Sequence, residues 1–293
     1  MDKKVKDILL KLTGHSDFLV ENIHSDEEEH TYEEVFDVSR NHKHYILKKT
    51  NSTELAFYKL GLKELPKIYA SYKDGEEYYI LIEKVKGNSV YKFSSYMIKP
   101  IIDAISSVQD KYWDKPVKGI DNYESEYASV LKRKEYIDDD RYIELLDEFS
   151  QVYQSVPRSI ASSDLLPFNL MFGEDGVRLI DFGSGGFLPY PVMVARLLAH
   201  TSNDINYVFY ISDKDKETAI KYYYDSFISK KGISYEEYMH DLRLFMFYEC
   251  TEYLMCYKKY IDEMNPWLEN EYKKAVIDCE KMYNEIKENS LSM

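Results

Sequence analysis

The sequence predicts an α+β protein with two lobes: a small antiparallel β-sheet lobe with one helix, followed by a larger, mainly helical lobe that carries a β-hairpin. Up to about Gly87 the apolar residues alternate like those of strands. After Gly87 they recur at the three- and four-residue spacing of amphipathic helices. Two short apolar runs around a Gly-Glu-Asp-Gly turn interrupt that pattern and predict the hairpin. We therefore divide the chain into lobes at residues 1–86 and 87–293.

The strands expected in the first lobe are residues 32–38, 44–48 and 77–83. A polar turn at residues 39–42 joins the first two strands. The single helix is expected at residues 52–60, where a Ser or Asn cap precedes apolar residues at helical spacing.

In the second lobe the apolar spacing predicts several helices on either side of the hairpin. The hairpin strands are expected at residues 169–172 and 177–180. The helical segments are expected at residues 96–113, 124–156, 192–200, 216–230, 235–264 and 269–287.

Composition narrows the classes of function. A chain of 293 residues with 44% hydrophobic and 31% charged residues is globular and can build two lobes that share a cleft. No apolar run approaches the roughly 20 residues of a membrane-spanning helix, and the first residues are amphipathic rather than secretory, so we expect a cytoplasmic protein. The net charge of -14 argues against a nucleic-acid partner and would attract a cationic small molecule, although it also serves solubility.

The three cysteines give no sign of a metal or disulfide site. Cys250, Cys256 and Cys279 all fall in the C-terminal helical region, with no close Cys or His partner at metal-ligand spacing. We expect reduced thiols in the core.

The strongest group of candidate catalytic residues surrounds the hairpin. Asn169 follows Asp164 by five positions, and Asp181 opens an Asp-Phe-Gly sequence directly after the second hairpin strand. Phosphoryl transfer needs hard oxygen ligands for Mg²⁺ and a base beside the incoming hydroxyl. Asn169 and Asp181 can supply the ligands, and Asp164 can act as the base. The alternative is that these residues only form turns around an ordinary hairpin.

Two upstream residues complete such a site. Lys48 ends a strand on the same face as Ile46, so it can reach into a cleft and meet the α- and β-phosphates, whereas Lys49 should point away. Glu54, on the first turn of the following helix, is placed to pair with Lys48 and fix its direction. A lysine at a strand end and a glutamate near a helix N-terminus are also common surface features.

Residues 162–172, Ser-Ser-Asp-Leu-Leu-Pro-Phe-Asn-Leu-Met-Phe, and the Asp-Phe-Gly segment through residue 198 resemble a known family. The chain looks like the aminoglycoside phosphotransferase and choline kinase branch of the protein-kinase-like fold from about residue 30 to residue 198. The resemblance implies ATP, with GTP as the alternative, together with Mg²⁺ and transfer to a small-molecule hydroxyl. It also implies an interlobe hinge at residues 82–87, where backbone groups of Glu83 and Val85 would bond adenine.

The sequence departs from the family pattern at three places. Ser162 stands where the family has a His before the catalytic Asp, and Met193 stands where it has an Asp that ties down the catalytic loop. The segment expected to cover the phosphates, residues 25–35, contains no Gly and carries an acidic run. A Gly-rich loop exposes backbone N–H groups to anions, and carboxylates repel anions. Either these side chains turn outward or nucleotide binding is weak.

Candidate residues for binding the acceptor lie in the C-terminal helices. Glu249 and Glu252 share one face of a strongly apolar helical segment, so their carboxylates need partners. A cationic acceptor such as an aminoglycoside or an amino alcohol would serve, and so would a Lys or Arg of a neighbouring helix. We expect the acceptor between the catalytic loop, the segment 123–141 and these helices. His200 and His240 are expected to be structural.

Three hypotheses follow. The first is an ATP- and Mg²⁺-dependent phosphotransferase that acts on a hydroxyl of a small, cationic molecule. The second is a nucleotide-binding pseudokinase or ligand-binding module with little activity, suggested by Ser162, Met193 and the acidic segment. The third is a protein kinase, which ranks lowest because no activation segment ending in Ala-Pro-Glu follows Asp181.

Overall fold

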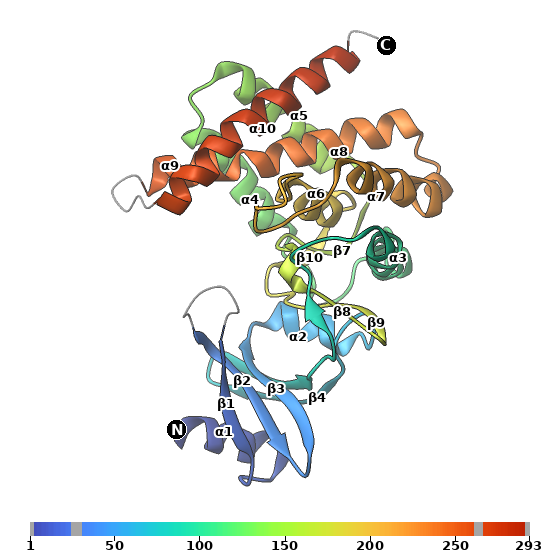
Figure 1. The fold of residues 1–293 in the computed structure, drawn as a ribbon. Coiled ribbons are helices and arrows are strands. Elements are labelled where there is room, and N and C mark those ends of the chain that lie inside the picture. Colours follow the sequence, from blue (N-terminus) through green and yellow to red (C-terminus); the bar gives the residue numbers. More distant parts are fainter. Residues whose placement is uncertain (1–2, 25–30, 261–265, 291–293) are drawn as a thin grey trace.

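The computed structural model describes residues 3–24, 31–260 and 266–290, and it confirms the α+β architecture with two lobes. Figure 1 shows a small lobe built on a β-sheet and a larger helical lobe, with the N-terminus in the first and the C-terminus at the far end of the second. The chain passes between them after β5.

The small lobe contains a five-stranded antiparallel sheet in the order β1-β2-β3-β5-β4. Its strands are β1 (Leu19–His24), β2 (Thr31–Arg40), β3 (Lys43–Thr50), β4 (Ile68–Asp74) and β5 (Glu77–Glu83). The three strands expected from the sequence are the central ones. The sequence did not reveal β1 and β4 because edge strands such as β4 are half exposed, which weakens the apolar alternation.

The two faces of the sheet have different partners. The outer face packs against α1 (Lys3–Thr13), whose Ile8 and Leu9 join Leu47 and Leu81 in a separate small core. The inner face carries Lys48, as its pairing register between β2 and β5 requires. Between β3 and β4 the chain forms α2 (Ser52–Lys59), which lies on the side of the large lobe in Figure 1 and whose apolar residues join the main core.

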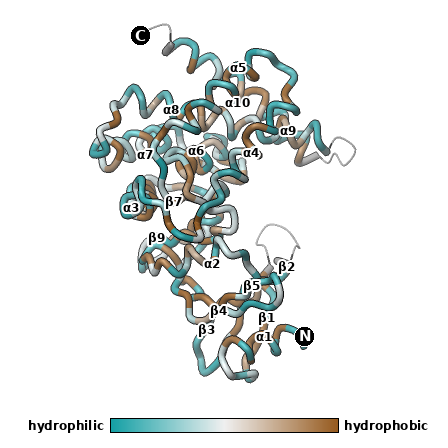
Figure 2. Tube along the Cα trace, turned by 180° about the vertical axis from the view of Figure 1, so that it is seen from behind, coloured by the Kyte–Doolittle hydropathy of each residue, from teal (hydrophilic) through white to brown (hydrophobic). Residues whose placement is uncertain are grey.

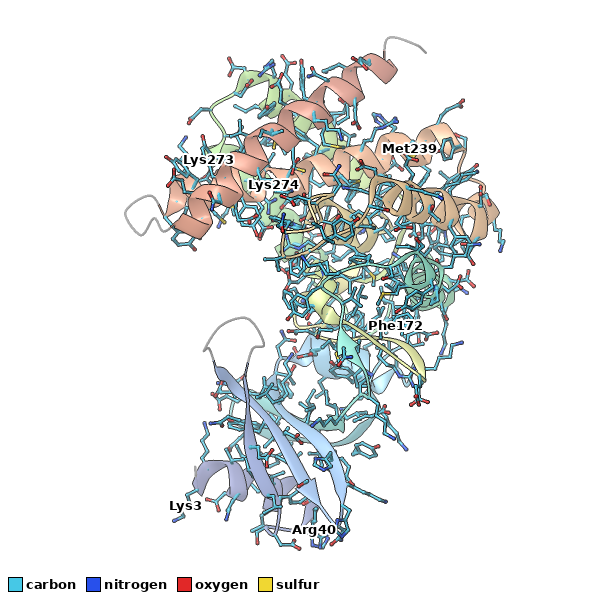
Figure 3. All side chains as sticks on the ribbon, viewed as in Figure 1. Lys3, Arg40, Phe172, Met239, Lys273 and Lys274 are labelled. Carbon is cyan, nitrogen blue, oxygen red and sulfur yellow. The ribbon has the colours of Figure 1, made fainter. Side chains whose placement is uncertain are left out.

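The large lobe has two small β-ladders beside its helices. The expected hairpin is confirmed as β8 (Leu170–Gly173) and β9 (Gly176–Leu179), and β6 (Asn88–Ser89) extends it. Phe172, labelled in Figure 3, lies on β8 where β6 pairs with it. The second ladder joins β7 (Arg158–Ser162) to β10 (Gly185–Pro189). This ladder lies next to the segment that carries Asp164, because β7 ends two residues before it.

The helices of the large lobe are α3 (Ser95–Lys111), α4 (Tyr123–Arg133), α5 (Asp140–Ser155), α6 (Val192–Ala199), α7 (Asp213–Ser226), α8 (Tyr235–Cys250), α9 (Glu252–Lys259) and α10 (Pro266–Ser290). Single turns of 3-10 helix are η1 (Lys134–Tyr136), η2 (Pro167–Asn169) and η3 (Ile228–Lys231). Every residue of α6 is buried, and Figure 2 shows hydrophobic residues concentrated around it. Among the described helices, none combines the length and apolar character needed to cross a bilayer.

Two expected helices are each divided in the structure. The segment 124–156 becomes α4 and α5, because Asp139 caps α5 with its carboxylate, which accepts from the Arg141 N–H. The segment 235–264 breaks at Thr251, whose hydroxyl donates to the Tyr248 carbonyl 2.7 Å away. Residues 261–264 of that expected helix lie outside the described residues.

The packing of α2 on the Asp-Phe-Gly turn yields a stability test. A Cβ atom at Gly185 would lie 2.4 Å from the Phe57 ring and 2.9 Å from the Phe182 carbonyl oxygen, whereas at Gly186 it would meet the end of the Leu188 side chain at 2.9 Å. We expect Gly185→Ala to lower the free energy of unfolding by about 1–3 kcal/mol, since a ring and a backbone atom must move.

The control is Gly186→Ala, where a flexible side chain can yield and the loss should be smaller. Urea unfolding of both variants measures the difference. Equal losses would contradict the close packing of Phe57 on this turn.

Candidate active site

Lys48, Glu54 and Asp181 form a connected charge network at the junction of the lobes. Lys48 Nζ lies 2.9 Å from Glu54 Oε1 and 2.8 Å from Asp181 Oδ1. The Glu54 side chain is 1% exposed and that of Asp181 is 47% exposed, so the network runs from the interior to solvent. Burial alone would lower the pKa of Lys48, but the carboxylates of Glu54 and Asp181 outweigh it and raise the pKa. The lysine is therefore charged.

Glu54 also anchors the Asp-Phe-Gly turn. Its Oε1 accepts from the Phe182 N–H at 3.2 Å, and its Oε2 accepts from the Thr50 hydroxyl. Asn51 caps α2 by accepting from the Glu54 N–H at 2.9 Å, and its amide donates to the Gly183 carbonyl at 2.8 Å. One helix terminus thus fixes both Lys48 and the turn that carries Asp181.

The backbone of Asp181 has a left-handed conformation, with φ of 60°. This region is unfavourable for most residues with a side chain, although Asp and Asn adopt it more readily than others. The turn follows a backbone bond in which the Ile180 N–H donates to the Asn169 carbonyl at 3.0 Å. Asp181 therefore lies next to Asn169, at the end of the hairpin.

Asp164 lies on a short, strongly hydrogen-bonded loop after β7. Its carbonyl accepts from the Leu166 N–H and from Asn169 Nδ2, both at 2.8 Å. Because Asn169 is buried and its amide nitrogen is bonded in this way, the amide is fixed in direction. The loop thus joins the three residues that the sequence analysis grouped, Asp164, Asn169 and Asp181, around one hairpin end.

The Asp164 carboxylate is bonded by an arginine that the sequence analysis missed. Arg196, on α6, places Nη2 2.9 Å from Asp164 Oδ1. Burial raises the pKa of Asp164 and Arg196 opposes that rise, while the Asp181 and Glu252 carboxylates add to it. A single arginine inside the otherwise apolar run Val-Met-Val-Ala-Arg-Leu-Leu-Ala was the available signal, since a buried charge needs a partner.

Glu249 and Glu252 meet the same arginine. Arg196 Nη1 lies 2.9 Å from Glu249 Oε2, and it also bonds Glu252. Burial opposes the charge of Glu249, but Arg196 and His200 outweigh it and lower the pKa. A neighbouring helix thus supplies the cation that the sequence analysis allowed for, and binding of the acceptor by these carboxylates stays a prediction. His200, Glu249 and Glu252 are close enough to share a metal ion, but the guanidinium already bonds all three.

The two family positions that differ are both buried. Ser162 Oγ accepts from the Asp164 N–H at 3.3 Å and approaches the Asp181 carbonyl at 3.5 Å. The Ser162 hydroxyl therefore contacts both the Asp164 loop and the Asp-Phe-Gly turn, each at a long distance. Met193 is fully buried in the main core, where its side chain offers no strong hydrogen-bonding group.

The acidic segment expected to cover the phosphates lies mostly outside the described residues, at positions 25–30. Of the remainder, Glu34 pairs with Lys49 at 2.9 Å, and Lys49 also pairs with Glu77 at 2.7 Å. Lys49 alternates with Lys48 along β3 and lies on the opposite face of the sheet. The Glu34 carboxylate is thereby turned away from the Lys48 side.

The expected hinge residues lie at the end of β5 and after it. The Glu83 N–H donates to the Lys67 carbonyl at 2.8 Å, and the Glu83 carboxylate accepts from the Lys67 N–H at 3.1 Å. Val85 lies in the connection to β6. Their contacts with a nucleotide base stay a prediction, as does the lobe boundary at residues 86 and 87.

Other expected residues have structural surroundings. His200 is buried beside Arg196, and His240 lies 3.4 Å from Glu148. Cys250 and Cys279 are buried and Cys256 is partly buried, all three without a disulfide. The burial of Cys250 and Cys279 matches the expectation that these thiols lie in the core.

Comparison with solved structures identifies the fold. The choline kinase from Streptococcus pneumoniae has a TM-score of 0.63 at 15% identity over 95% of this chain and 98% of its own. An amicoumacin kinase in complex with AMP-PNP and Ca²⁺ has a TM-score of 0.63 at 14% identity, covering 97% and 94%. An aminoglycoside phosphotransferase from Streptomyces rimosus, in complex with ADP and streptomycin, has a TM-score of 0.56 at 13% identity, covering 87% and 99%.

The comparisons with family models and with curated proteins found no match. The likeness to solved structures nevertheless confirms the resemblance seen in the sequence at the level of the fold. The chain has the protein-kinase-like fold of choline kinases and aminoglycoside phosphotransferases.

The two adjacent lysines of β3 provide a test of the network. Lys48→Met removes the cation from the buried Glu54, so we expect the free energy of unfolding to fall by about 3 kcal/mol or more. Lys49→Met removes a partly exposed cation from the other face, where its partners Glu34 and Glu77 are open to solvent, and should cost much less stability. Urea unfolding of both variants measures the contrast, and similar effects of the two substitutions would contradict the network.

Proposed function

We propose that this protein is a cytoplasmic, ATP- and Mg²⁺-dependent phosphotransferase that transfers the γ-phosphate to a hydroxyl of a small, cationic molecule. The main support is that Lys48 bonds both Glu54 and Asp181 beside the Asp164 loop. The protein-kinase-like fold is the second support. Phosphoryl transfer depends mainly on positioning and charge stabilisation, which are the properties that such an arrangement supplies.

The donor atoms fit a hard divalent cation. Asp181 offers a half-exposed carboxylate, and Asn169 offers its amide oxygen, since its amide nitrogen is committed to the Asp164 carbonyl. Oxygen ligands of this kind suit Mg²⁺. When bound, Mg²⁺ would neutralise charge on the β- and γ-phosphate oxygens.

The residues of the chain then have distinct roles. Lys48 keeps its bond to Glu54 and exchanges Asp181 for the α- and β-phosphates of ATP. Asp164 accepts the proton of the acceptor hydroxyl while the acceptor oxygen forms its bond to the γ-phosphorus. The bond between that phosphorus and the bridging oxygen breaks, and ADP leaves with the electron pair.

The charge around Asp164 supports a cationic acceptor. Glu126 on α4 is partly buried, and burial raises its pKa, with the nearby Glu249 and Asp164 carboxylates adding to the rise. Together with Glu252, these four carboxylates outnumber the nearby cations Arg196 and Arg133. The names of the similar structures, choline kinase and aminoglycoside phosphotransferase, support the same class of acceptor.

A nucleotide-binding pseudokinase is the second candidate. It is favoured by Ser162 and Met193, which leave the catalytic loop with long hydroxyl contacts where the family has a His and an Asp. Such a protein would bind ATP without transferring phosphate at a useful rate.

A screen for ATP-dependent phosphorylation separates the candidates. The wild-type protein is incubated with Mg²⁺, ATP and aminoglycosides, choline, ethanolamine or small sugars, and mass spectrometry detects a phosphorylated product. We expect a product with at least one amine-bearing acceptor. Nucleotide binding without any product would favour the pseudokinase.

Substitution of the proposed base tests the chemistry. Asp164→Ala should reduce turnover at least about 100-fold, because the hydroxyl loses its proton acceptor, while ATP still raises the melting temperature. The control is Asp175→Ala in the exposed β8–β9 turn, which should keep wild-type turnover. Unchanged turnover in Asp164→Ala would rule out the assigned role.

A further inference from the structure

Arg196 connects the catalytic loop to the helices on the acceptor side. It lies on α6, which is buried along its whole length, and its Nη2 bonds Asp164. Its Nη1 bonds Glu249 near the end of α8, Glu252 at the start of α9, and His200 Nε2 at 2.8 Å. One guanidinium therefore joins the catalytic loop, α6, α8 and α9.

The charges around Arg196 argue against a direct role on phosphate. Three carboxylates, those of Asp164, Glu249 and Glu252, surround one guanidinium. The arginine side chain is only 11% exposed, so little of its charge is available to an anionic substrate. The rigid, planar guanidinium of Arg196 instead fixes the orientation of the carboxylates, since its nitrogens hold their partners at fixed angles.

The contact between Arg196 and Asp164 uses one carboxylate oxygen of Asp164 and leaves the other free to meet a substrate. Arg196 bonds Oδ1, and the Asp164 side chain is 40% exposed. Within the described parts of the chain, Arg196 is the only side chain that bonds this carboxylate. Ser162 and Asn169 bond the backbone of Asp164, so they fix the loop but not the direction of the carboxylate.

We propose that Arg196 is the positioning residue for Asp164, holding Oδ1 so that Oδ2 faces the acceptor hydroxyl. The proposal rests on the proposed function, in which Asp164 is the base. Glu249 and Glu252 hold the guanidinium from the other side, so the junction of α8 and α9 sets the direction of the base. This arrangement compensates for the bracing groups absent at Ser162 and Met193.

Arg196→Lys is the direct test. Lysine keeps the charge among the carboxylates but lacks the fork that spans Asp164 and the two glutamates. We expect kcat to fall about 100-fold through misplacement of the base, with KM for ATP and the ATP-induced rise in melting temperature unchanged. Arg40→Lys is the matched control, because Arg40 pairs with Asp17 at the far end of the small lobe and should keep wild-type kcat.

Crystal structures of the wild-type protein and of Arg196→Lys provide a readout that does not depend on turnover. The Asp164 carboxylate should occupy one rotamer in the wild type and several in Arg196→Lys, with the backbone of residues 162–169 unmoved. If no acceptor is ever phosphorylated, the proposed function fails, and the rotamers still decide whether Arg196 orients Asp164. Wild-type kcat in Arg196→Lys, or one unchanged Asp164 rotamer, would overturn the proposal.

Glu252→Gln provides a second variant should Arg196→Lys fail to fold. Glutamine keeps an oxygen for Nη1 but removes one of the charges that hold the guanidinium. We expect kcat to fall by less than in Arg196→Lys, with KM for ATP unchanged. A higher acceptor KM at unchanged kcat would assign Glu252 to the acceptor and contradict the proposal.

Discussion

The buried carboxylate of Glu54 is the constraint on which the rest of the candidate site depends. It binds Lys48 from the sheet, the Thr50 hydroxyl at the end of the same strand and the Phe182 N–H from the large lobe. A carboxylate with 1% of its side chain exposed must satisfy its oxygens inside the protein. Moving either lobe would break one of these bonds, so Glu54 fixes the position of Lys48 relative to Asp181.

Arg196 is a second buried charge with several partners, on the side where we propose that the acceptor binds. It gathers three carboxylates that would otherwise repel one another, and only one of them belongs to the catalytic loop. One buried charge thus organises each half of the candidate site, Glu54 on the side of Lys48 and Arg196 on the side of Asp164. The Asp164 loop and the Asp-Phe-Gly turn lie between them and meet at Ser162.

The sequence predicted the parts of the site that depend on short spacings. Strand alternation fixed the face of Lys48, and the hairpin turn fixed the relation of Asn169 to Asp181. It did not predict Arg196 as a partner, because Glu249 and Glu252 lie 53 and 56 positions away and apolar periodicity carries no information on such pairs. The break at Thr251 was missed because the apolar spacing continues across it.

The central claim is that Asp181 and Asn169 form, with Lys48, a site for Mg²⁺ and ATP. Calorimetric titration of ATP into the wild-type protein and into Asp181→Asn, each with and without Mg²⁺, tests it most directly. The claim predicts that Mg²⁺ tightens ATP binding by the wild type and has a much weaker effect on Asp181→Asn, because a neutral amide replaces the charged ligand. Wild-type affinity for ATP that is independent of Mg²⁺ would contradict the claim.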